Sequence, residues 1–180
     1  MSPDKLAVLA DRKDLEALRS IQASDIGDFL RSMMSAVEEE STPPNIDKLM
    51  SLGVTLAKAG HESSDRDALE WLNAEPSPRR VGIVAAFLTG LWQIPFRSAS
   101  VPPESADLFL QALRVTGLDD DAMYMSVLAL SVLMIPKASK EVKVEVAKAL
   151  RELARHEYDD PVAARLSQSV IEKALQRAGV

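Results

Sequence analysis

Residues that typically begin or end α-helices recur along this chain at short intervals, and these start and stop signals strongly limit the folds that the chain can adopt. Asn45 and Asp160 stand where a helix would begin, and Gly60 and Gly179 stand where one would end. Between such signals the apolar residues follow the helical period. In the stretch 26–37 they occur at i, i+3, i+4, i+7, i+8 and i+11, which gives one apolar stripe. The pattern predicts about nine helices.

The residue types agree with a helical chain. Alanine, leucine, glutamate, lysine and arginine are abundant, and these residues lose least on entering a helix. Strand-like alternation occurs only at 141–146, where helical spacing resumes at once. We therefore expect an all-α fold of antiparallel helical hairpins, arranged as an α-solenoid-like stack or an irregular helical bundle. Residues 1–180 would form one domain, with 1–75 and 101–180 as its halves, joined by an apolar helix at 80–93.

That helix at 80–93 is apolar on nearly every side, which places it in the centre of a bundle or beneath a partner. It is far shorter than the ~20 apolar residues that cross a bilayer. The start of the chain lacks the basic and apolar pattern of a signal peptide. We therefore expect a soluble, cytoplasmic protein that does not enter a membrane.

A spacing of 40 residues separates Asp25 from Asp65 and again Asp120 from Asp160, each at a predicted helix start. The middle interval is longer by about the length of one helix, so we interpret the chain as four hairpins with one additional helix. Together with the segment Asp-Asp-Pro-Val-Ala-Ala-Arg at 159–165, this rhythm resembles HEAT and armadillo repeats. The resemblance implies stacked helix pairs and an extended binding surface.

Candidate catalytic and metal-binding groups are sparse. His61 and His156, the only two histidines, each begin a His-Glu-x-x-Asp segment, but neither segment has the second histidine that a zinc protease needs. Both lie at predicted helix junctions, where histidine and aspartate suit helix ends. The acidic run 119–121 lacks the spacing of a calcium loop and is better explained as a helix cap. The chain has no cysteine, nucleophile elbow or glycine-rich phosphate loop. We expect no enzyme activity, no cofactor and no metal.

Charge disfavours a nucleic-acid partner. The formal net charge is −6, and the basic residues between positions 137 and 155 alternate with glutamates that can pair with them at helical spacing. Arg79 and Arg80 are interpreted as an exposed basic pair, too small to form a binding groove.

Several side chains are suited to a protein partner. Candidate contact residues are Trp92, Phe96, Arg97, Met123 and Tyr124, with Phe96 and Arg97 in a proline-bounded loop at 94–103. The methionine pair at 33–34 is a further source of adaptable apolar surface. Core packing is the competing explanation for each of them.

We expect a non-enzymatic protein-protein interaction module, such as an adaptor, an inhibitor or immunity-type protein, or an assembly factor. One alternative is a structural homo-oligomeric subunit whose fifth and seventh helices pack across a two-fold axis. Another is a nucleic-acid binder or small enzyme with a site assembled from scattered residues.

Overall fold

The computed structural model describes residues 3–93, 121–134 and 140–179, and these ranges contain nine α-helices and no β-strand. The helices are α1 (Pro3–Asp11), α2 (Leu15–Arg19), α3 (Ala23–Glu39), α4 (Ile46–Lys58), α5 (Ser64–Ala74), α6 (Pro78–Trp92), α8 (Asp121–Met134), α9 (Lys140–Leu153) and α10 (Pro161–Ala178). The prediction of an all-α fold is confirmed. No helix of the described ranges has the length and apolar character required to span a membrane.

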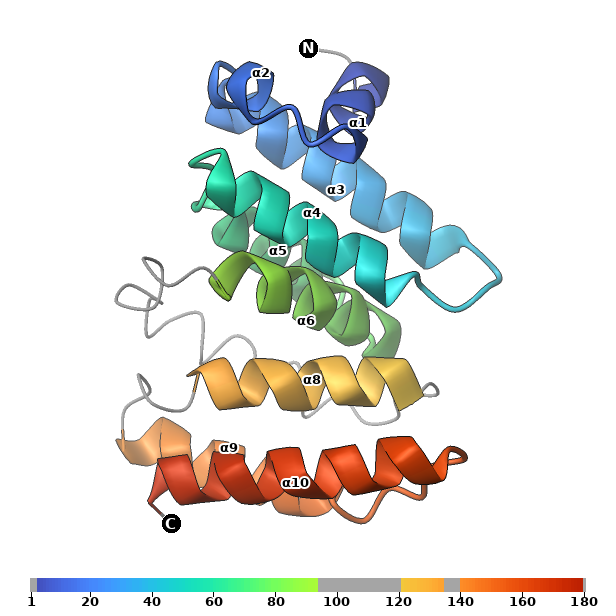
Figure 1. The fold of residues 1–180 in the computed structure, drawn as a ribbon, viewed down its shortest axis with the longest axis vertical. Helices are drawn as coiled ribbons and strands as arrows, with labels where there is room; N and C mark the ends of the chain where they lie inside the picture. Colours follow the sequence, from blue (N-terminus) through green and yellow to red (C-terminus); the bar gives the residue numbers. More distant parts are fainter. Residues whose placement is uncertain (1–2, 94–120, 135–139, 180) are drawn as a thin grey trace.

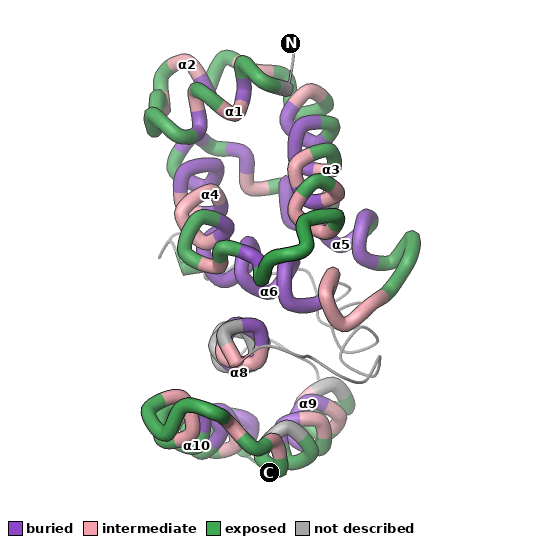
Figure 2. The backbone as a smooth tube through the Cα atoms, turned by 90° about the vertical axis from the view of Figure 1, so that its right-hand side faces the viewer, coloured by how far each residue is buried: buried purple, intermediate pink, exposed green. Residues whose placement is uncertain are grey.

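The helices form two stacked layers (Figures 1 and 2). Helices α4, α6, α8 and α10 follow one another in the front layer of Figure 1, each packed against the next. Helices α3, α5 and α9 lie behind them, and α1 and α2 cover the N-terminal end of the stack. The two ends of the chain therefore lie at opposite ends of the molecule. This layering is compatible with the α-solenoid alternative.

Local chemistry explains where several helices begin and end. The side chains of Asn45 and Asp160 accept hydrogen bonds from backbone N–H groups in the first turns of α4 and α10. Gly179 ends α10 in the left-handed conformation, at φ 70°, which glycine adopts without steric cost. These predicted boundaries are confirmed. Helix α3 begins at Ala23, so its cap is Gln22 and not Asp25, the predicted helix start.

Helix α6 is the centre of the core. Every residue from Val81 to Trp92 is buried, and the helix packs against α4 on one side and α8 on the other. Of the two places predicted for it, the bundle centre is correct, and α6 has no free face for a two-fold interface between copies. It also packs against α5, the helix that precedes it.

Arg79 and Arg80 join the first turn of α6 to the end of α3, and the prediction that they form an exposed pair is wrong. Arg79 donates to the backbone carbonyls of residues 37, 40 and 42, where α3 ends and its carbonyls lack helical partners. The Arg80 guanidinium donates to Glu38 and lies over the Trp71 ring, 4.4 Å from its centroid. Both arginines are thus structural.

Candidate protein-binding groove

The structure describes three of the five predicted contact residues, Trp92, Met123 and Tyr124. Trp92 is only 3% exposed and Met123 only 5%, so both belong to the core. Tyr124 is half-buried and stacks on His156. Phe96 and Arg97 lie outside the described residues. Core packing thus explains Trp92 and Met123, although the Trp92 indole N–H has no hydrogen-bond partner among the described residues.

The two His-Glu-x-x-Asp segments have structural contacts. The imidazole of His61 is buried, and its Nε2 donates to the carbonyl of Leu18 over 2.7 Å, which ties the turn after α4 to α2. His156 Nε2 lies 3.3 Å from Asp121 Oδ1 at the start of α8. Within residues 3–93, 121–134 and 140–179, no group of three or more His, Asp or Glu side chains is placed to hold a metal ion.

Around His156 the structure builds a small aromatic cluster. The Tyr124 ring stacks on the imidazole at 3.6 Å between centroids, and the Tyr158 ring meets the same imidazole edge-on at 4.7 Å. Burial raises the pKa of the Tyr158 phenol, and the nearby Ser167 hydroxyl lowers it by less. The Tyr158 hydroxyl is buried and lacks a partner of hydrogen-bonding geometry among the described residues.

This raised pKa leads to a test at alkaline pH. Above the usual tyrosine pKa of about 10, an unfolded chain has released a proton that folded Tyr158 still holds, so stability falls as pH rises through this window. We expect Tyr158→Phe to remove this part of the decline and to cost little at neutral pH, because the hydroxyl has no hydrogen-bond partner among the residues that the structure describes. Urea unfolding at several pH values measures both effects. Tyr124→Phe is the comparison and should keep most of the Tyr158 contribution, because burial raises the Tyr158 pKa more than the Tyr124 charge does. An unchanged alkaline slope in Tyr158→Phe would contradict the assignment.

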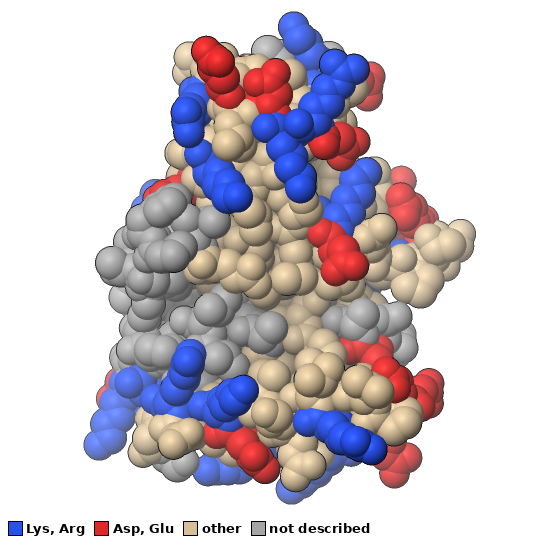
Figure 3. Space-filling view, in the orientation of Figure 1, with Lys and Arg blue, Asp and Glu red and all other residues tan. Residues whose placement is uncertain are grey.

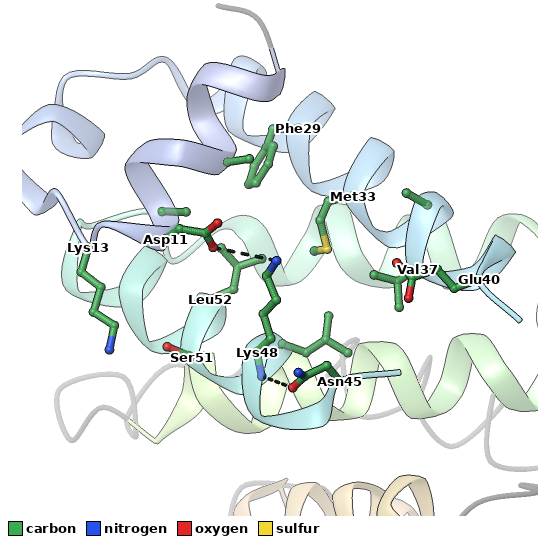
Figure 4. A pocket seen from close by; sticks show the side chains of 14 residues that line it. Asp11, Lys13, Phe29, Met33, Val37, Glu40, Asn45, Lys48, Ser51 and Leu52 are labelled. Atoms are coloured by element: carbon green, nitrogen blue, oxygen red, sulfur yellow. Dashed lines mark hydrogen bonds and ion pairs between the residues drawn. The ribbon is translucent and has the colours of Figure 1, made fainter. Parts of the chain in front are cut away.

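The described residues also form an apolar groove at the N-terminal end of the stack, between α1, α3 and α4, with a volume of about 420 Å³ (Figure 4). This volume lies within the range of protein ligand pockets. Eight of the fourteen lining residues are apolar: Ala7, Ala10, Phe29, Met33, Ala36, Val37, Leu49 and Leu52. Phe29 and Leu49 are buried and form the floor, whereas Ala36 is exposed at the mouth. The groove is therefore open to solvent.

Side-chain size explains why this space is empty. The groove is lined on α1 by Ala7 and Ala10 and on α3 by Ala36, so a methyl group stands where a larger side chain would fill the gap. Met33 lies among them and is half-buried, and its unbranched thioether can adapt to different partners. Its neighbour Met34 is fully buried in the core. Of the predicted methionine pair, only Met33 lines the groove.

Charged side chains stand around the groove and differ between its two ends (Figure 4). Lys13 and Lys48 lie toward the end where α1 closes, and Glu40 lies at the opposite end, where α3 finishes. Lys48 Nζ lies 4.0 Å from Asp11 Oδ1, and both side chains are largely exposed, so this ion pair is weak. In the part of the chain that the structure describes, Lys13 and the Glu40 carboxylate form no ion pair. The rim can therefore pair with an incoming partner.

Only part of this groove can be predicted from the sequence. Helical periodicity identifies the apolar stripe of α3, but it does not show that α1 leaves part of that stripe uncovered. The groove requires three helices and residues up to 45 positions apart, from Ala7 to Leu52.

No family model, curated protein or solved structure matches this chain.

Proposed function

We propose that the protein is a non-enzymatic protein-protein interaction module that receives an apolar helix of a protein partner in the groove between α1, α3 and α4. The observation that carries the proposal is an open apolar groove whose charged rim is largely unused by the chain itself. Amphipathic helices dock into such grooves through apolar side chains one turn apart. The adaptable Met33 supports the same reading.

Surface charge supports a protein partner over a nucleic acid. On the face shown in Figure 3, basic and acidic side chains are interspersed over both ends of the molecule. A phosphate backbone is bound through a continuous basic patch or stripe, which the described residues of this face do not form. The net charge of −6 acts in the same direction.

Affinity capture with a blocked groove tests the proposal. In Ala36→Arg, the long side chain enters the groove from its exposed mouth without disturbing a buried position. We expect binding of the captured protein to fall about tenfold or more, the effect of losing roughly 1.4 kcal/mol. Ala74→Arg is the matched control, because Ala74 is also exposed and helical but lies outside the groove.

Both variants should unfold at the same temperature as the parent protein. Equal capture by Ala36→Arg and Ala74→Arg would refute the groove as the binding site, and recovery of nucleic acid alone would refute the function.

A further inference from the structure

Helix α10 exposes an apolar ridge at the other end of the stack. Val162 is 61% exposed and Leu166 is 54% exposed, the two highest values among the exposed large apolar side chains of the described residues. They are four positions apart on one helix and therefore lie on the same face. Two apolar side chains one turn apart are what a helix presents to a groove.

Charged side chains on α10 and just before it lie beside the ridge. Asp159 precedes the ridge, and Arg165 and Lys173 follow Val162 at three and eleven positions, which brings them onto the same side of the helix. All three are exposed, and none of them forms an ion pair with another described residue. The ridge is therefore acidic before Val162, at Asp159, and carries Arg165 directly beside Leu166, whereas farther along α10 Lys173 stands next to the exposed Glu172.

The groove presents the complementary order. Its α1 end, with Lys13 and with Lys48 paired to Asp11, has a net positive charge and would face Asp159, and Glu40 at the other end would face Arg165. Val162 and Leu166 would then enter the apolar part between them. The opposite direction would bring like charges together at both ends, so charge selects one orientation of the helix.

We propose that the helix received by the groove is α10 of a second copy of this chain. This inference rests on the proposed function, because it names the occupant of the same groove. The groove and the ridge lie at opposite ends of one molecule, so after docking one copy still has a free groove and the other still has a free ridge (Figure 1). Such a head-to-tail contact does not close on two copies, and assembly continues into chains or rings.

Sedimentation velocity over a range of protein concentrations tests this assembly, in about 0.15 M salt so that the net charge of −6 is screened. The parent protein is expected to grow beyond a dimer. Leu166→Glu should weaken association about 10- to 100-fold, because a leucine side chain is no longer buried. Val144→Glu is the matched control, since Val144 is 47% exposed but lies on α9, away from the ridge.

Mixing two variants gives the sharpest result. Leu166→Glu has a damaged ridge and an intact groove, and Ala36→Arg has the reverse. Each alone should be monomeric, and an equal mixture should form dimers and nothing larger, because only one contact can form. A parent protein that stays monomeric, or Leu166→Glu that associates like the parent, would overturn the proposal.

The same sedimentation experiment also tests the order of the charges along the groove and the ridge. Glu40→Lys and Arg165→Glu should each weaken association about two- to fivefold, the range of exposed ion pairs, and the double variant should recover it. If the parent protein does not self-associate but captures another protein in the groove, the second copy is refuted as the occupant and the proposed function still stands. Capture that does not depend on the groove would refute both.

Discussion

Replacing Gly90 with alanine is expected to lower the free energy of unfolding by about 3 kcal/mol or more, although alanine favours a helix. The reason is the contact between α4 and α6. A methyl group on Gly90 would stand 2.7 Å from the carbonyl carbon of Met50 and 2.9 Å from its Cα. On the facing helix, a methyl group on Gly53 would stand 2.6 Å from the Leu91 nitrogen. At both positions the added methyl group would meet backbone atoms of the facing helix, so no side-chain movement can relieve the clash.

Gly82→Ala is the matched control, because it makes the same chemical change in the same helix. The added methyl group would meet the buried side chain of Met123, whose outer atoms can move to another rotamer but whose Cβ, 2.9 Å away, can move only with α8. We expect a loss of about 1–2 kcal/mol in this variant, smaller than that of Gly90→Ala. Urea unfolding of the three proteins measures the difference. Equal stabilities of Gly90→Ala and Gly82→Ala would contradict the close approach of α4 and α6.

Arg80→Met is expected to destabilise the protein by about 2 kcal/mol, because it removes the charge that holds Glu38. Arg80 Nε lies 2.8 Å from both Glu38 carboxylate oxygens, and the two side chains are 12% and 24% exposed. The same guanidinium donates to the Trp71 carbonyl and covers the Trp71 ring. Hydrogen bonding to Glu38 raises the pKa of the Arg80 guanidinium further above its usual value.

A double-mutant cycle with Glu38→Gln isolates this pair from other effects of the substitution. We expect a coupling of about 1–2 kcal/mol between positions 38 and 80, within the usual range for directly contacting residues. Arg66→Met, at an exposed arginine of α5, should leave stability within about 0.5 kcal/mol of the parent. A coupling near zero would show that the two side chains act independently.

Local patterns predicted much of the fold. The Asn45 cap, the stop at Gly179 and the apolar stripe of α3 each depend on a few neighbouring residues, which the sequence places directly. The sequence did not indicate which helix approaches Gly90 closely, because Met50 belongs to another helix.

Long-range contacts explain the predictions that were wrong. Arg79 and Arg80 look like a surface pair beside Pro78, yet their partners are at the end of α3, about 40 residues away. The same holds for the groove. Periodicity placed both methionines on the apolar side of α3, and only the position of α1 leaves Met33 accessible and Met34 buried.

The most direct measurement is photo-crosslinking from inside the groove. A photoreactive amino acid at position 33 is compared with the same residue at the exposed position 70 on α5. Our account predicts a specific adduct from position 33 to one apolar helical segment of a protein, identified by mass spectrometry and lost when Ala36→Arg blocks the groove. An adduct to α10 would support both proposals, and a helix of another protein would support the groove alone. Equal labelling from both positions, or labelling that Ala36→Arg leaves unchanged, would contradict the account.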